Sequence, residues 1–151
     1  MVTVVTRYRP VSKSYPANLT APGSARAHLQ AILRNFELSP ESDRAQVAIS
    51  VVSELVANAV GRLPDGDASV DVHVLYIYDG VQLLVHVHDR LAGNLQIHDM
   101  PAPDADAENG RGLAMVDILS AHWGWHPRAS GGHCVWAVVD MLDSSDSELS
   151  V

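Results

Sequence analysis

The sequence predicts an α+β two-layer sandwich, in which helices cover one face of a mostly antiparallel mixed sheet. Three observations lead to this fold class. Helical and strand-like segments follow in the order helix, helix, strand, strand, long connection, helix, strand, strand. Turn residues join the strand-like runs in pairs. The chain has 151 residues and is 47% hydrophobic, which suffices for one buried core.

Two helices are expected before the first strand pair. Residues 24–36 carry apolar residues at helical spacing behind Ser24, which can cap the first turn. Residues 40–62 start at Pro40, since proline tolerates the first helical position. This second segment is apolar on nearly all sides, so we expect it to be largely buried. A third helix is expected over about residues 112–121.

The strands are expected in two hairpins. Residues 69–78 and 81–89 are rich in β-branched residues and are joined by Asp79-Gly80, a strong hairpin signal. Residues 122–128 and 131–141 form the second pair, around Ser130-Gly131-Gly132. A further short β-like piece lies in residues 2–10.

The domain organisation follows from these elements. Residues 1–22 are expected to form an N-terminal strand or arm, and residues 23–140 the folded domain. Residues 141–151 are acidic and serine-rich and are expected to be a disordered tail. The connection from about residue 90 to 109 is long for a small domain, which is typical of functional or mobile loops.

Composition narrows the class of protein. The net charge of −8 disfavours direct binding of nucleic acid or of an anionic membrane surface. Cys134 is the only cysteine, which excludes an intrachain disulfide and a zinc site built from cysteines. The first residues have no apolar signal core, and no run is long enough for a membrane helix. The cytoplasm is the simplest location for such a chain.

One candidate site lies in the second helix. Glu54 and Asn58 are four residues apart and therefore share a helix face, among apolar neighbours. Burying these groups without partners costs several kcal/mol. In one interpretation they form hydrogen bonds to a loop or a neighbouring strand. In the other, Asn58 is an oxygen ligand of Mg²⁺ and Glu54 is a base.

Two further motifs suggest nucleotide chemistry. Asp89 ends a strand, with Gly93 four residues later, and can accept a hydrogen bond from an exocyclic amine or simply begin a turn. Gly110-Arg111-Gly112 precedes an apolar helix, where backbone N–H groups can approach phosphate. The alternative is a glycine turn with ordinary capping.

The histidines are also considered as metal ligands. His86 and His88 alternate on a strand and can face one side together. No further ligand has a recognisable spacing in the sequence, so the pattern does not by itself predict a metal centre.

Taken together, the motifs form an ordered set: Glu-x-x-x-Asn on a helix, Asp after a strand, a long loop, and Gly-x-Gly opening a helix. This set resembles the ATP-binding fold of gyrase, the ninety-kilodalton heat-shock chaperones, histidine kinases and mismatch-repair proteins. The stretches "SELVANAV", "ENGRGLAMVDILSAHWGW" and "GGHCVWAVV" are most similar to anti-sigma regulatory factors, the serine-kinase-like branch of that superfamily, in its actinobacterial single-domain form. The resemblance covers roughly residues 20–140.

The resemblance implies a role for each motif residue. It implies that Asn58 ligates Mg²⁺ at the nucleotide phosphates, that Glu54 polarises an attacking serine hydroxyl and that Asp89 binds the adenine amine. Gly93 and Cys134 belong to the implied nucleotide site. The resemblance further implies a phosphate-facing hinge at Gly110, Arg111, Gly112 and Leu113, with residues 91–109 as the lid.

Four positions depart from the family pattern. Arg62 stands where members commonly have histidine, and Leu91 where they have glycine or serine. His133 and Cys134 occupy the positions of a common lysine and threonine. A thiol is a poorer hydrogen-bonding group than a hydroxyl. Leu91, His133 and Cys134 are therefore expected to weaken the nucleotide site.

The implied function is partner switching in transcription regulation. Members of the family capture a sigma factor and release it when an anti-anti-sigma protein of the STAS type binds, and some phosphorylate a serine of that protein. ATP and Mg²⁺ are the implied cofactors of such a serine/threonine kinase. The alternative is a degenerate binding module without nucleotide. Members often dimerise, so a homodimer is also considered.

Overall fold

The structure, a computed structural model, describes residues 8–61, 71–89, 108–127 and 133–142. Three helices and five strands lie in this part of the chain. In chain order they are β1 (Val11–Pro16), α1 (Ala21–Asn35), α2 (Asp43–Gly61), β2 (Asp71–Tyr78), β3 (Gln82–Asp89), α3 (Glu108–Leu119), β4 (His122–Pro127) and β5 (His133–Asp140).

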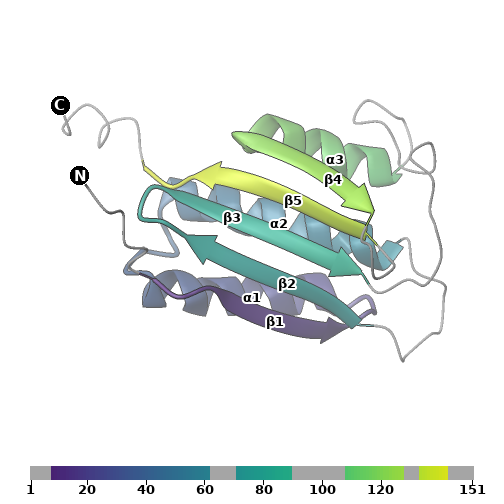
Figure 1. Cartoon of the computed structure of the whole chain (residues 1–151), viewed down its shortest axis with the longest axis horizontal. Helices are drawn as coiled ribbons and strands as arrows, with labels where there is room; N and C mark the ends of the chain where they lie inside the picture. The colour runs from purple at the N-terminus through teal and green to yellow at the C-terminus, as the bar shows by residue number, and fades with distance from the viewer. Residues whose placement is uncertain (1–7, 62–70, 90–107, 128–132, 143–151) are drawn as a thin grey trace.

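The five strands form one sheet in the order β1-β2-β3-β5-β4. Each neighbouring pair is antiparallel. All three helices lie behind the sheet in Figure 1, while the front face of the sheet carries no described helix. The predicted two-layer α+β sandwich is therefore confirmed, and the described part of the sheet is antiparallel throughout. The last two strands are out of chain order, because β5 pairs with β3 and leaves β4 at the edge.

The turn between β2 and β3 forms as its residues predict. Gly80 has a φ of 98°, which glycine adopts without steric cost. The Asp79 carboxylate accepts hydrogen bonds from the backbone N–H groups of Val81 and Gln82, at 2.8 and 2.7 Å. This local hydrogen bonding sets the register of the hairpin, in which Tyr78 pairs with Leu83.

The first two helices begin at other residues than expected. α1 starts at Ala21, three residues before the expected start, because Pro22 is accommodated in its first turn. α2 starts at Asp43 rather than Pro40. The Ser42 hydroxyl caps α2 by accepting the backbone N–H of Ala45 at 3.2 Å. The first four N–H groups of a helix have no partner within the helix, and the Ser42 hydroxyl satisfies that of Ala45.

Two other boundaries differ. α3 begins at Glu108, four residues before the expected start, so Gly110 and Gly112 belong to the helix. The first strand is Val11–Pro16, which follows the predicted β-like piece at residues 2–10. Residues 1–7 lie outside the described part, as do the turn at residues 128–132 and the predicted tail beyond residue 142.

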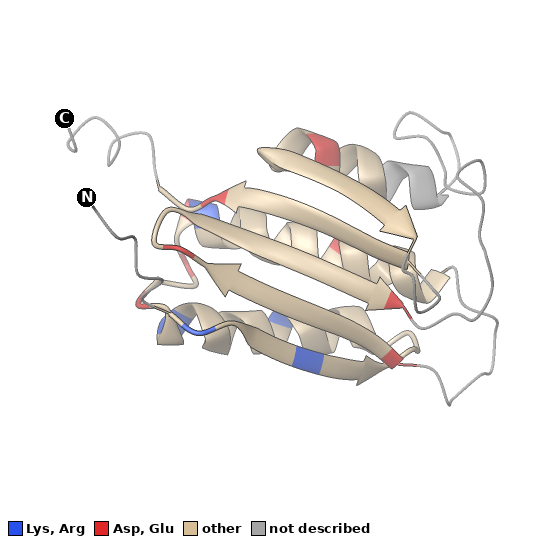
Figure 2. Cartoon of the chain, in the orientation of Figure 1, with Lys and Arg blue, Asp and Glu red and all other residues tan. Residues whose placement is uncertain are grey.

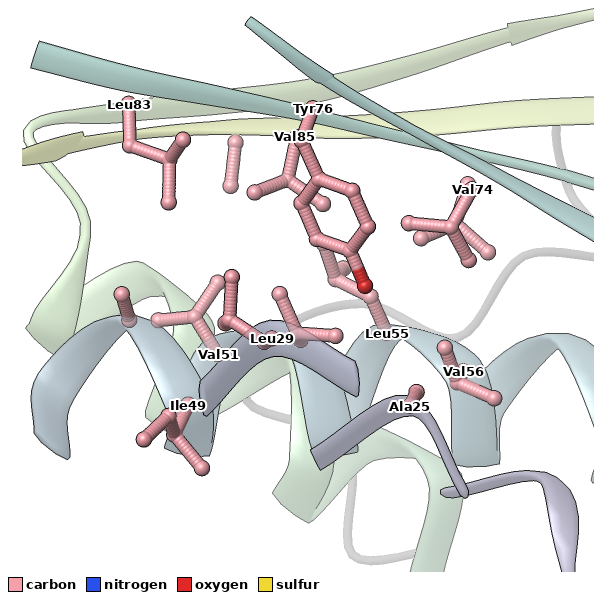
Figure 3. Close-up of a cluster of buried hydrophobic side chains, with 14 of the residues drawn as sticks. Ala25, Leu29, Ile49, Val51, Leu55, Val56, Val74, Tyr76, Leu83 and Val85 are labelled. Carbon is pink, nitrogen blue, oxygen red and sulfur yellow. The ribbon is translucent and has the colours of Figure 1, made fainter. Parts of the chain in front are cut away.

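The core lies between the sheet and the helices. Alternate residues of β2 and β3 are buried, which is the pattern of strands with one covered face. In Figure 3, Tyr76 and Val85 of the sheet point toward Leu29, Val51 and Leu55 of the helices. None of the helices in the described ranges is long and apolar enough to cross a membrane.

Candidate functional site

The predicted motif residues gather at one end of the molecule. The last turn of α2, the end of β3 and the starts of β5 and α3 all lie at the same end of the sandwich in Figure 1. α3 packs against α2, and α2 packs against β3 and β5. This arrangement brings together segments that are separated by up to about eighty residues in the sequence.

Asn58 is buried in the last full turn of α2, with 3% of its surface exposed. Within the described part of the chain, neither its amide nitrogen nor its amide oxygen has a hydrogen-bond partner. A buried polar group without a partner costs about 1–3 kcal/mol, so such groups are rare in native proteins. An oxygen ligand aimed at a cation would remove this cost, and Asn58 therefore fits an implied Mg²⁺ site.

Glu54 lies one helical turn before Asn58 on the same side of α2 and is half-buried. The apolar neighbours of both residues, Val51, Leu55 and Val56, are fully buried. The predicted amphipathic placement of this pair, polar groups within a buried apolar helix, is therefore observed.

Asp89 is fully buried at the end of β3. Its Oδ1 accepts the backbone N–H of His133, the first residue of β5, at 2.9 Å. The His133 side chain is buried beside it, with Nδ1 4.0 Å from the same oxygen. Neither ring nitrogen of His133 has a hydrogen-bond partner among the residues that the structure describes. Its ring centroid lies 6.0 Å from that of Trp125 on β4.

Cys134 is not brought to this site. Successive strand residues point to opposite faces, so Cys134 faces away from Asp89, on the side of the sheet without helices. Its Sγ lies instead near two histidines of β3. The residue beside Asp89 is His133, because the register of β5 on β3 places it there.

The Gly-Arg-Gly motif occupies the third to fifth residues of α3, across its first turn, rather than a loop before it. The first four N–H groups of a helix have no partner within the helix, so this turn remains suited to an anion. Leu113 is buried against the core. Gly93, Leu91, Arg62 and the predicted lid up to residue 107 lie outside the described residues.

A second group of polar side chains lies on the open face of the sheet. His86 and His88 both face this side, as the sequence predicts, and their ring centroids are 5.7 Å apart. Burial, with a smaller effect of the nearby His126, lowers the pKa of His86. Figure 2 shows that the charged residues of the described strands lie at the strand ends, except for Lys13 of β1.

Comparisons with known proteins identify the family and the fold. Residues 15–139 match the family described as the histidine kinase-like ATPase domain. A match over most of the chain defines its class, and the protein belongs to the histidine kinase-like ATPase family.

Among solved structures, the chain is similar to the RsbU and RsbW domains of Rv1364c from Mycobacterium tuberculosis. The two share 20% sequence identity with a TM-score of 0.57. The similarity covers 89% of this chain and 34% of that chain, so this protein spans about a third of the length of that one. At this identity the likeness concerns the fold. No curated protein matches the chain.

Proposed function

We propose that this protein binds ATP with Mg²⁺ at the end of the sandwich where α2, β3 and α3 meet. The observation that carries the proposal is the buried Asn58 amide, whose nitrogen and oxygen both lack a hydrogen-bond partner in the described ranges of the chain. Family membership supports the choice of ATP. In this reading, the unfavourable burial of Asn58 is offset when its oxygen binds the cation.

The other motif residues supply the rest of the site. The Asp89 carboxylate accepts a hydrogen bond from the His133 backbone N–H, and it would also accept one from the exocyclic amine of adenine. The first turn of α3, which includes Gly110 and Arg111 and is followed directly by Gly112, would present backbone N–H groups to the phosphates. Leu113 anchors this turn in the core. Bound Mg²⁺ would neutralise phosphate charge.

We further propose phosphoryl transfer to a serine of a partner protein. Glu54 lies one turn from Asn58 and would accept the proton of the serine hydroxyl. The serine oxygen forms a bond to the γ-phosphorus, the bond to the β,γ-bridging oxygen breaks, and ADP leaves. The half-buried position of Glu54 keeps the carboxylate accessible to a second protein.

The proposed partners are a sigma factor and an anti-anti-sigma protein of the STAS type. Support comes from the similarity of the Glu54–Asn58 helix, the Gly-Arg-Gly turn and the final strand to anti-sigma factors. The similarity of the fold to a structure that includes an RsbW domain also supports these partners. The cytoplasm, where sigma factors act, is the proposed location, and a homodimer is the proposed assembly of this family type.

One observation favours the alternative, a degenerate module that binds partners without nucleotide. The His133 ring is buried beside Asp89, where an adenine would lie. An imidazole that fills this space would compete with the base. A variant with a smaller side chain at position 133 can therefore distinguish ATP binding from the nucleotide-free function.

Calorimetric titration with ATP and Mg²⁺ tests the nucleotide site. The wild-type chain is expected to bind one ATP, and Asn58→Leu to lose this binding, because leucine has the same shape but no oxygen ligand. Asn35→Leu, an exposed position at the end of α1, is the matched control and should bind as the wild type does. Absence of binding heat and of a thermal shift in the wild type would exclude the ATP site.

His133→Thr separates the degenerate alternative from the ATP-binding function. If the imidazole blocks the adenine position, the variant gains ATP binding that the wild type lacks. If the wild type already binds ATP, the variant is expected to change affinity only modestly. A wild type and a variant that both fail to bind ATP would favour the degenerate module.

A further inference from the structure

A row of polar residues crosses the open face of the sheet. The strand register pairs Ser14 with His73, His73 with His88, and His88 with Cys134. Cys134 pairs in turn with His126 on β4. Cross-strand partners in one row lie roughly 4.5–5.5 Å apart, so their side chains are within reach of each other. The row is on the face opposite to Asp89 and takes no part in the proposed nucleotide site.

Three side chains in and beside this row converge. Cys134 Sγ lies 3.6 Å from His86 Nδ1 and 3.9 Å from His88 Nε2. These ligand atoms all lie within 4.8 Å of one another. His86 joins the row because it is two residues from His88 on the same face of β3.

The spacing matches that of a tetrahedral metal site. With Zn–S near 2.3 Å and Zn–N near 2.0–2.1 Å, tetrahedral geometry puts a sulfur and a nitrogen ligand roughly 3.5 Å apart. The two observed sulfur–nitrogen distances are within a few tenths of an ångström of this value. An adjustment of the histidine side chains would suffice to close the site around an ion.

We infer that His86, His88 and Cys134 form a binding site for a divalent transition-metal ion, with Zn²⁺ as the best match. A thiolate with two imidazoles is a donor set that suits zinc and excludes Mg²⁺, which requires hard oxygen ligands. Three protein ligands leave a fourth position for water or for His126. His126 is the cross-strand partner of Cys134 and is exposed.

The surroundings of the three residues suit an ion. Cys134 is fully buried, while His86 and His88 are half-buried, so the ion would enter from the open face past the two imidazoles. No helix covers this face within the described chain (Figure 1). A bound ion would tie β3 to β5, two strands that are adjacent in the sheet but distant in sequence.

Zinc titration by calorimetry tests the site in the full chain, after treatment with a chelator and with Mg²⁺ in excess. The wild type is expected to bind one Zn²⁺ per chain and to unfold at a higher temperature with Zn²⁺. Cys134→Ser and His88→Gln should each weaken binding by at least about tenfold. His122→Gln is the matched control and should bind as the wild type does. His122 lies on the same open face of β4, four residues before His126, and pairs with Val138.

Cobalt provides a second measurement that does not depend on stability. Co²⁺ bound to the wild type should show the charge-transfer absorption of a thiolate–cobalt bond, and His86→Gln should alter or abolish it. His86 is half-buried at the open face, so this variant should fold even if Cys134→Ser does not. Asn58→Leu should retain zinc binding, which separates this site from the ATP site.

Three results would overturn the inference. The first is the absence of saturable Zn²⁺ binding by the wild type. The second is equal affinity of the wild type and a folded His88→Gln variant. The third is an equal loss in His122→Gln, which would indicate ions held by scattered surface histidines.

Discussion

Among the described residues, two buried side chains at the proposed nucleotide site carry polar atoms without hydrogen-bond partners. They are Asn58, through both amide atoms, and His133, through both ring nitrogens. Each is at least 97% buried. A fold that needed only a packed core would gain by replacing them with apolar groups, because unsatisfied polar groups destabilise. Their presence at one end of the sandwich is typical of a site that trades stability for binding.

The first prediction concerns Asn58 and runs against the usual effect of a core mutation. Asn58→Leu is expected to increase the free energy of unfolding of the ligand-free protein by about 1–3 kcal/mol, because it removes an unsatisfied amide and conserves shape. Urea unfolding without nucleotide measures the change. Asn35→Leu, which is exposed, should stay within about 0.5 kcal/mol of the wild type. A destabilised Asn58→Leu protein would mean that the amide has partners in solution.

At the scale of elements, one cross-strand pair contributes to the packing of the edge strand β4 against β5. Gly124 of β4 is paired with Trp136 of β5 on the open face. A Cβ atom built on Gly124 would lie 2.8 Å from the Trp136 ring. The glycine therefore lets the indole lie directly against the backbone of β4. An aromatic side chain over a strand glycine compensates for its missing side chain.

The second prediction is that Gly124→Ala destabilises the protein by about 1–3 kcal/mol, because the Trp136 ring must move to admit the methyl group. The midpoint of urea unfolding measures this effect, and near-ultraviolet circular dichroism reports the ring movement. Gly23→Ala is the control, since its Cβ would meet only the end of the flexible Arg26 side chain at 3.4 Å. An unchanged midpoint for Gly124→Ala would show that the edge strand adjusts without cost.

At the scale of the whole molecule, tyrosines in the core make stability depend on alkaline pH. Burial raises the pKa of Tyr76 far above its ordinary value of 10, and the nearby Tyr15 adds to the shift. Burial also raises the pKa of Tyr15. In Figure 3 the Tyr76 ring extends from the sheet toward the helix layer, with Leu29 and Leu55 at its tip.

The third prediction follows from the direction of these shifts. Below about pH 10, folded and unfolded chains both keep the phenol protons, so the tyrosines do not alter stability. Above this pH the unfolded chain loses protons that the folded chain retains, so the free energy of unfolding falls by up to about 1.4 kcal/mol per pH unit for Tyr76.

Urea unfolding at about pH 8 and at about pH 11 measures this loss of stability, because one pH lies below and the other above the ordinary tyrosine pKa. Tyr76→Phe should show a smaller loss than the wild type, because phenylalanine has no proton to release from the unfolded chain. An equal loss in both proteins would assign the pH dependence to other groups.

Periodicity accounted for most of the fold. The alternating runs of β2 and β3 and the Asp79-Gly80 turn are local features, and the structure agrees with them. The helices begin three or four residues away from their predicted starts, because the first turn depends on which hydroxyl or proline fits it. Ser42 rather than Ser39 caps α2, and no apolar pattern distinguishes these two serines.

The sequence by itself determined the fold class, the Glu54–Asn58 helix face and the shared face of His86 and His88, because spacing along a regular element is a local property. Only the tertiary structure decided which distant residues meet. β5 pairs with β3 as well as with β4, its neighbour in the chain. This pairing puts Cys134 beside His88, although the two residues are 46 positions apart in the sequence. The same pairing turns His133, not Cys134, toward Asp89, because adjacent residues of a strand point to opposite faces.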